Sequence, residues 1–132
     1  MEAIELRMGN FINYPLNTKV NPIVVNGVIG NKIYTDSFEG DAECFFPIPL
    51  TEEWLLKLGF EYSDSKIKDH PQLLSIEISS LETLDFEDGE FFISNASSVR
   101  VLTLWNQPVS VHQLQNLLFA LKGKELTLNK NY

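Results

Sequence analysis

The chain has 132 residues, of which 44% are hydrophobic and 21% charged, and its formal net charge is −8. These values are typical of a soluble globular protein with one domain. The acidic balance disfavours nucleic acid as a partner, because Lys and Arg side chains must replace counterions along the phosphates.

Two further features indicate the location of the protein. No apolar run approaches the length of a membrane span, and Met1–Glu5 lacks the basic start and apolar core of a signal peptide. The single cysteine, Cys44, excludes an internal disulfide, fits a reducing compartment and is expected to be a small core residue. The sequence therefore predicts a cytoplasmic protein with no membrane partner.

Residues 6–46 have the patterns of short strands. The expected strands are 11–14, 22–29 and 32–35. Gly30-Asn31 is a two-residue hairpin signal, although Asn26-Gly27 is a competing turn, so the register between 20 and 36 stays open. Residues 37–41 are expected to form a loop and 42–46 a last strand. This stretch predicts a small bent β-sheet, for which an SH3-like barrel is one form.

A linker and a short helix are expected next. The two prolines of 47–50 cannot donate regular ladder hydrogen bonds, so this segment is predicted to be a linker. Thr51 is a suitable N-cap for a helix whose first turn carries two glutamates, and Gly59 can end that helix.

Residues 60–105 return to strand patterns. Apolar and polar residues alternate over 74–79, and Asp88-Gly89 joins the runs 84–87 and 90–93 as a type I′ hairpin signal. A further run covers 99–105. Because these runs are too closely spaced for helical crossovers, the sequence predicts an antiparallel meander.

Residues 110–123 carry the most complete helix signal of the chain. Ser110 and Gln113 have capping-box spacing, Val109 and Leu114 could form a hydrophobic staple, and Gly123 can end the helix. Five apolar side chains share its core-facing side: Val111, Leu114, Leu117, Leu118 and Leu121. We expect this helix to cover the meander, and residues 125–128 to add an edge strand.

Together these elements predict an α+β fold in a single domain, 1–132. Its expected sub-lobes are a small β-lobe over 1–46 and a helix–meander–helix lobe over 51–132, joined by the linker 47–50.

A second face of the 110–123 helix carries the candidate binding site. Its residues follow one another at positions i, i+3, i+4 and i+7: His112, Gln115, Asn116 and Phe119. An imidazole, two amides and an aromatic ring could bind a polar ligand or a partner's backbone. The alternative is that they bond to strand edges or loops of their own chain, and patterning alone does not separate the two.

No catalytic or metal-binding pattern is present. The two histidines lack the company of zinc ligands, and no glycine-rich phosphate loop or nucleophile elbow occurs. The acidic cluster within 82–90 lacks the order of a calcium-binding loop and is expected to be a solvated hairpin tip. The sequence therefore disfavours enzyme activity and predicts no cofactor and no metal.

Three sequence blocks occur in order: Leu6–Asn10 (L-R-M-G-N), Pro47–Phe60 (P-I-P-L-T-E-E-W-L-L-K-L-G-F), and His112–Leu117 (H-Q-L-Q-N-L) followed by Gly123–Leu126 (G-K-E-L). In this order they resemble a large group of small, uncharacterised proteins encoded in prophages and conjugative elements of gut anaerobic bacteria. That group has no assigned reaction, cofactor or catalytic residue. The resemblance therefore implies only a protein that acts in the cytoplasm of a bacterium carrying a mobile element.

Three functions follow as hypotheses. The first is a non-enzymatic accessory protein of a phage or mobile element that binds a host macromolecule, such as a host protein. The second is a small-ligand binder that sequesters a nucleotide, and the third is a structural homo-oligomer without a ligand. The residues that would serve a nucleotide are the aromatic side chains of Trp54, Trp105 and Phe119 and the basic side chains of Arg100, Lys122 and Lys124.

Overall fold

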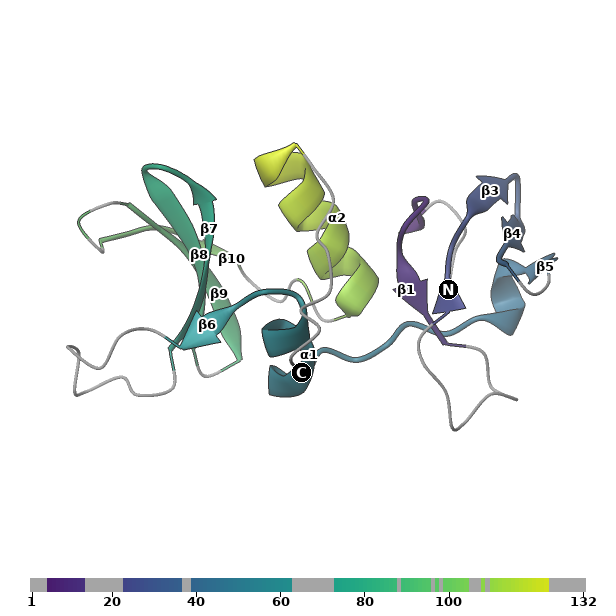
Figure 1. Cartoon of the computed structure of the whole chain (residues 1–132), viewed down its shortest axis with the longest axis horizontal. Helices are drawn as coiled ribbons and strands as arrows, with labels where there is room; N and C mark the ends of the chain where they lie inside the picture. Colours follow the sequence, from purple (N-terminus) through teal and green to yellow (C-terminus); the bar gives the residue numbers. More distant parts are fainter. Residues whose placement is uncertain are drawn as a thin grey trace. The chain divides into compact units, whose positions relative to one another are not determined.

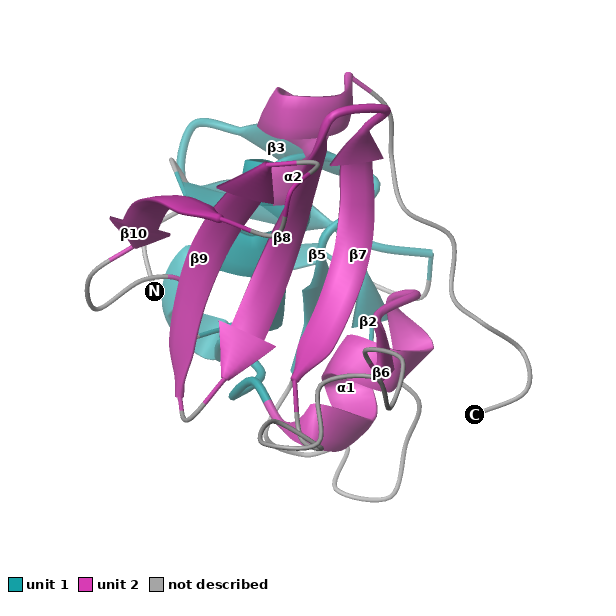
Figure 2. Ribbon diagram, turned by 90° about the vertical axis from the view of Figure 1, so that its left-hand side faces the viewer, with its two compact units in different colours: residues 1–50, 109–117 teal, residues 51–108, 118–132 magenta. Residues whose placement is uncertain are grey.

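The computed structural model of the chain describes residues 5–13, 23–36, 39–62, 73–87, 89–95, 97, 99–104, 108 and 110–123. The described elements confirm an α+β fold of antiparallel sheets with one main C-terminal helix (Figure 1). The chain divides into two compact units, unit 1 with residues 1–50 and 109–117 and unit 2 with 51–108 and 118–132 (Figure 2). Unit 1 thus includes 109–117, which the sequence analysis assigned to the C-terminal sub-lobe.

The described strands of unit 1 lie in two small antiparallel sheets. β1 (Phe11–Ile12) pairs with β2 (Ile23–Val24), and a second sheet has the order β3 (Gly27–Ile29), β4 (Lys32–Tyr34), β5 (Glu39–Asp41). Ile29 lies opposite Lys32, and Gly30 has a φ of +59°. Gly30-Asn31 is therefore the hairpin turn, and the run expected as one strand is divided between the two sheets.

Two expectations for the end of this stretch are wrong. Residues 39–41, expected to be a loop, form β5, and 42–46, expected to be a strand, begin with the 3₁₀ helix η2 (Ala42–Cys44). Gly40 lies under the Phe45 ring, which would be 3.4 Å from a Cβ at that position. A glycine is therefore suited to this strand, although glycine in a polar segment is more typical of a loop. Cys44, expected in the core, is exposed.

One apolar core serves both sheets of unit 1. Its fully or nearly buried members are Leu6, Ile12, Val25, Ile33, Ala42 and Phe45, with Ile23 and Val28 packed against them. The predicted linker 47–50 is also attached to unit 1, since Ile48 is buried and its carbonyl accepts a hydrogen bond from Val111 N (2.8 Å).

Unit 2 begins with α1 (Glu52–Lys57). Thr51 Oγ1 accepts a hydrogen bond from Trp54 N (3.3 Å), and Gly59 has a φ of +105°, so the predicted cap and stop are confirmed.

The predicted meander is confirmed as a five-stranded antiparallel sheet in the order β10-β9-β8-β7-β6. Its strands are β6 (Glu61–Tyr62), β7 (Leu74–Ser79), β8 (Glu82–Glu87), β9 (Glu90–Asn95) and β10 (Arg100–Leu104). Glu87 lies opposite Glu90 and Gly89 has a φ of +81°, as expected at the β8–β9 hairpin. On the apolar side of the sheet, Phe91 contacts the rings of Phe60 and Phe86, with centroids 6.4 and 4.9 Å apart.

The long helix, α2, spans Val111–Lys122. Its first residues, to Leu117, belong to unit 1 and the rest to unit 2. Val111, Leu114 and Leu118 are fully buried, whereas Leu121, expected in the core, is exposed. Gly123 ends the helix as predicted, with a φ of +75° and its N–H bonded to the Phe119 carbonyl (2.8 Å).

No helix in the described part of the chain is long and apolar enough to cross a membrane. The Val109 staple and the edge strand expected over 125–128 lie outside the described residues.

Candidate functional site

The segment Leu6–Asn10 forms a tight turn in unit 1. Asn10 N donates to the Arg7 carbonyl (3.0 Å), and Gly9 has a φ of +96°, a conformation that favours glycine. Asn10 Oδ1 accepts a hydrogen bond from Arg7 N (2.6 Å), and the Asn10 side chain is fully buried. The side chain and the backbone of Asn10 therefore both stabilise this turn.

Gln115 of α2 binds the backbone of this turn at two points. Its Nε2 donates to the Gly9 carbonyl (3.0 Å), and its Oε1 accepts from Phe11 N (2.8 Å). Gln115 is 1% exposed, so both bonds are shielded from water. One amide thus satisfies a carbonyl and an N–H group that would otherwise be costly to bury.

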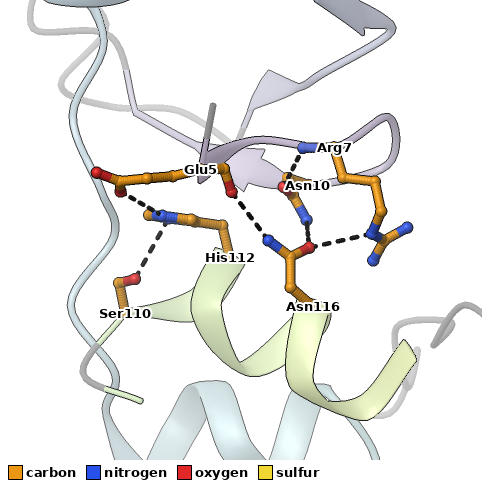
Figure 3. Close-up of polar contacts among 6 residues, drawn as sticks. All are labelled: Glu5, Arg7, Asn10, Ser110, His112 and Asn116. Atoms are coloured by element: carbon orange, nitrogen blue, oxygen red, sulfur yellow. Dashed lines mark hydrogen bonds and ion pairs between the residues drawn. The ribbon is translucent and has the colours of Figure 1, made fainter. Parts of the chain in front are cut away.

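Asn116 binds the same segment from the next position of the helix. Its Nδ2 donates to the Glu5 carbonyl (2.9 Å), while its Oδ1 accepts from Asn10 Nδ2 (2.8 Å) and Arg7 Nε (3.1 Å). Figure 3 shows these side chains converging on the Asn116 amide. The amide nitrogen donates one hydrogen bond and the amide oxygen accepts two, so Asn116 holds the turn from both sides.

His112 lies beside this cluster and is 1% exposed. Its Nδ1 is 3.3 Å from Ser110 Oγ and its Nε2 is 3.4 Å from Glu5 Oε2 (Figure 3). Burial lowers the pKa of His112 below its ordinary value, although the nearby Glu5 carboxylate opposes this shift. The imidazole is therefore held neutral in the folded protein at neutral pH.

The polar face of α2 thus binds a backbone, and that backbone belongs to its own chain. The structure brings together His112, Gln115 and Asn116, as expected if these side chains bond to loops of their own chain. Phe119 lies in the part of α2 that belongs to unit 2, and it is 39% exposed. The hydrogen-bonding capacity considered for an external ligand is largely used inside unit 1.

Parts of all three sequence blocks that carry the resemblance meet in unit 1. The turn of L-R-M-G-N is bound by the Gln and Asn of H-Q-L-Q-N, and the Ile48 carbonyl of P-I-P-L accepts from the N–H that begins α2. Pro49 also pairs with Ser110 in an isolated β-bridge. The residues named here therefore have a structural role within unit 1.

The five-stranded sheet of unit 2 has one polar face. The register places in neighbouring rows the side chains that alternate with its apolar residues: Ser75, Glu77, Thr83, Asp85, Glu87, Glu90, Phe92 and Ser94. None of the strands β7, β8 and β9 carries Lys or Arg. The face is therefore acidic.

Asp85 lies on this face but is only 7% exposed. Its Oδ1 accepts hydrogen bonds from Ser75 Oγ (2.6 Å) and Thr83 Oγ1 (2.9 Å), and its Oδ2 from Ser94 Oγ (2.6 Å). The expectation of a solvated acidic tip is wrong for this residue. The sequence signal for this network is the placement of Ser75, Thr83 and Ser94 on adjacent strands. That signal can be interpreted only once the register of the strands is known.

Arg100 crosses the same face from β10. Its guanidinium lies 3.8 Å from the centroid of the Phe92 ring, and its Nη2 is 2.9 Å from Glu87 Oε1 on β8. Glu87 and Glu90 lie directly opposite each other, a pairing of like charges that destabilises a sheet. Arg100 therefore offsets one of two facing carboxylates.

β10 is an edge of the sheet (Figure 2), and apolar side chains in and beside it are exposed. Val99, Val101 and Leu102 are 55, 54 and 51% exposed. Exposed apolar residues on an edge strand are unusual, because natural proteins protect such edges with charge, proline or short length. We refer to residues 99–104 as the β10 edge.

Two of the residues proposed for a nucleotide have partners within the chain. Lys57 Nζ lies 5.1 Å from the Trp54 ring centroid, and Arg100 binds Glu87. Trp105 and Lys124 lie outside the described residues. The described residues also contain no group of His, Cys, Asp and Glu side chains that could hold a metal ion.

Comparison with known proteins gave no match to a protein-family model, a curated protein or a solved structure.

Proposed function

We propose that the chain is a non-enzymatic accessory protein of a phage or mobile element, which acts in the bacterial cytoplasm by binding a host macromolecule. The observation that carries this proposal is the row of exposed Val99, Val101 and Leu102 side chains on the β10 edge. Apolar side chains on an open strand edge are a risk for aggregation, and they are retained where a partner covers them.

The polar residues of α2 already make hydrogen bonds within their own chain, which favours a binding surface elsewhere in the molecule. Gln115 and His112 are buried, and their hydrogen bonds are made within unit 1. A ligand that needed these groups would have to displace the L-R-M-G-N turn. The β10 edge needs no such rearrangement, so it is the better candidate.

The proposal is tested by recovering complexes of the full chain from a bacterial lysate and weighing them by native mass spectrometry. Val101→Lys, which adds a charge to the β10 edge, is expected to abolish the complex. Leu81→Lys is the matched control, because Leu81 is similarly exposed but lies outside the β10 edge. The absence of any complex, or equal recovery by both variants, would contradict the proposal.

A further inference from the structure

We propose that the partner binds as a basic, extended protein segment that adds a sixth strand to the sheet of unit 2 along β10. This inference rests on the proposed function and names the partner's chemistry and binding mode. It follows from three features of the β10 edge: its open backbone, its apolar side chains and the acidic face beside it.

The backbone of β10 has hydrogen-bonding groups on its outer side. Asn95 N donates to the Val99 carbonyl (2.9 Å), which shows that the backbone groups of Asn95 in β9 point toward β10. Alternation then directs the backbone groups of Ile93 toward β10 and those of its partner Leu102 toward β9. Thr103, next in the strand, therefore points its N–H and C=O away from β9. No described strand pairs with this side of β10.

The two edges of the sheet differ in a way that favours β10 as the docking edge. β6, at the other edge, has two residues, Glu61 and Tyr62, so it is short and begins with a charge. β10 has five residues, and its bulge lies at its first residues, which leaves 102–104 in regular register. Short length blocks strand addition at β6, whereas at β10 the charge and the bulge are confined to the start of the strand and leave 102–104 open.

The charges of the sheet indicate a basic partner. On the polar face, β7, β8 and β9 carry no Lys or Arg, and Arg100 of β10 already binds Glu87. Four carboxylates lie on this face: Glu77, Asp85, Glu87 and Glu90. A second copy paired along β10 would extend the same acidic face without adding a free cation, because its Arg100 would likewise be bound to its own Glu87. A cationic segment would instead be attracted to this face.

Arg100 shows that a cation on one strand can reach a carboxylate two strands away. Its side chain extends from β10 over Phe92 of β9 to Glu87 of β8. An added strand beside β10 would lie two strands away from β9. An Arg side chain on it could therefore reach Glu90 of β9, as the Arg100 side chain on β10 reaches Glu87 of β8. Glu90 is the carboxylate that faces Glu87, so a partner's arginine would relieve the remaining like-charge contact.

The experiment uses a fluorescent peptide of alternating threonine and arginine, and measures its anisotropy with the full chain at about 150 mM salt. Two peptides are controls. In one, proline replaces threonine, which retains the charge but removes backbone donors; in the other, glutamate replaces arginine. We expect saturable binding of the first peptide, binding about tenfold weaker for the proline peptide, and none for the glutamate peptide.

Variants of the chain locate the binding. Thr103→Pro removes an outward N–H and is expected to weaken binding about tenfold, with Val101→Lys as a second edge variant should Thr103→Pro not fold. Glu90→Gln is expected to weaken binding, whereas Glu61→Gln, the same change at the opposite edge, should leave it unaltered.

Three results would overturn the inference: equal binding of the proline peptide, equal effects of Glu90→Gln and Glu61→Gln, or a homodimer that Thr103→Pro dissociates. A Val101-dependent complex in lysate without peptide binding would contradict this inference and leave the proposed function standing. Peptide binding without any lysate complex would contradict the proposed function alone.

Discussion

Gln115 carries two buried hydrogen bonds of unit 1, and its replacement gives the sharpest test at the scale of one residue. Gln115→Ala leaves the Gly9 carbonyl and the Phe11 N–H without their partner. Each orphaned group costs about 1–3 kcal/mol, so we expect the free energy of unfolding to fall by about 2–6 kcal/mol. Chemical denaturation measures this loss. A loss of less than about 1 kcal/mol would contradict the explanation.

His112 predicts a specific pH dependence. Burial lowers its pKa below the ordinary 6.5, so the unfolded chain takes up the proton first as the pH falls. The stability that the neutral imidazole contributes is complete above about pH 6.5 and is lost as the pH falls toward the folded-state pKa. We therefore expect His112→Gln to show a shallower decrease of unfolding free energy than the wild type between about pH 7 and about pH 5.5. Parallel curves for the two proteins would refute this.

At this scale the sequence revealed which residues act together but not what they bind. Helical spacing placed His112, Gln115 and Asn116 on one face, and the structure confirms that they share a cluster. Their target, the turn at Gly9, lies about a hundred residues away in sequence, and no local pattern links the two. The buried Asp85 was missed for the same reason, because its donors come from three different strands.

On the scale of secondary structure elements, the polar network of the five-stranded sheet predicts a second stability difference. Asp85→Ala leaves the hydroxyls of Ser75, Thr83 and Ser94 without their common acceptor. We expect a loss of about 2–4 kcal/mol in unfolding free energy, since hydrogen bonds to a charged group are stronger than neutral ones. Glu77→Ala, at an exposed position of the same face, should change stability by less than about 0.5 kcal/mol. Similar losses from both variants, in denaturant titrations, would contradict the role of the network.

Elements with strong local signals were predictable, and those defined by distant packing were not. The caps at Thr51 and Gly123 and the hairpin at Gly89 depend on a few adjacent residues, and all three are confirmed. β5 was missed because Gly40 serves as a strand residue only when Phe45 covers it. Residues 42–46 were likewise expected to form a strand, whereas the hydrogen bond from Phe45 N to the Ala42 carbonyl closes a helical turn.

At the scale of the whole molecule, the net charge of −8 predicts a response to salt. Raising the salt concentration from about 0.01 M to about 0.1 M shortens the Debye length from about 30 to about 10 Å. Repulsion among the carboxylates is then screened, so we expect the melting temperature to rise. Glu90→Gln, which removes one member of a facing pair, should reduce the rise in a calorimetric scan. A melting temperature independent of salt would count against self-repulsion in the folded state.

Unit 1 is discontinuous in the chain, and this affects the order in which the protein can fold during synthesis. The strands β6–β10 leave the ribosome as one uninterrupted stretch, and their antiparallel pairs join neighbours in sequence. The L-R-M-G-N turn emerges first but meets Gln115 and Asn116 only after the whole of that sheet has been made. A chain truncated before residue 110 and released from the ribosome should therefore hold a protease-resistant sheet and a first fifty residues that are still readily cleaved.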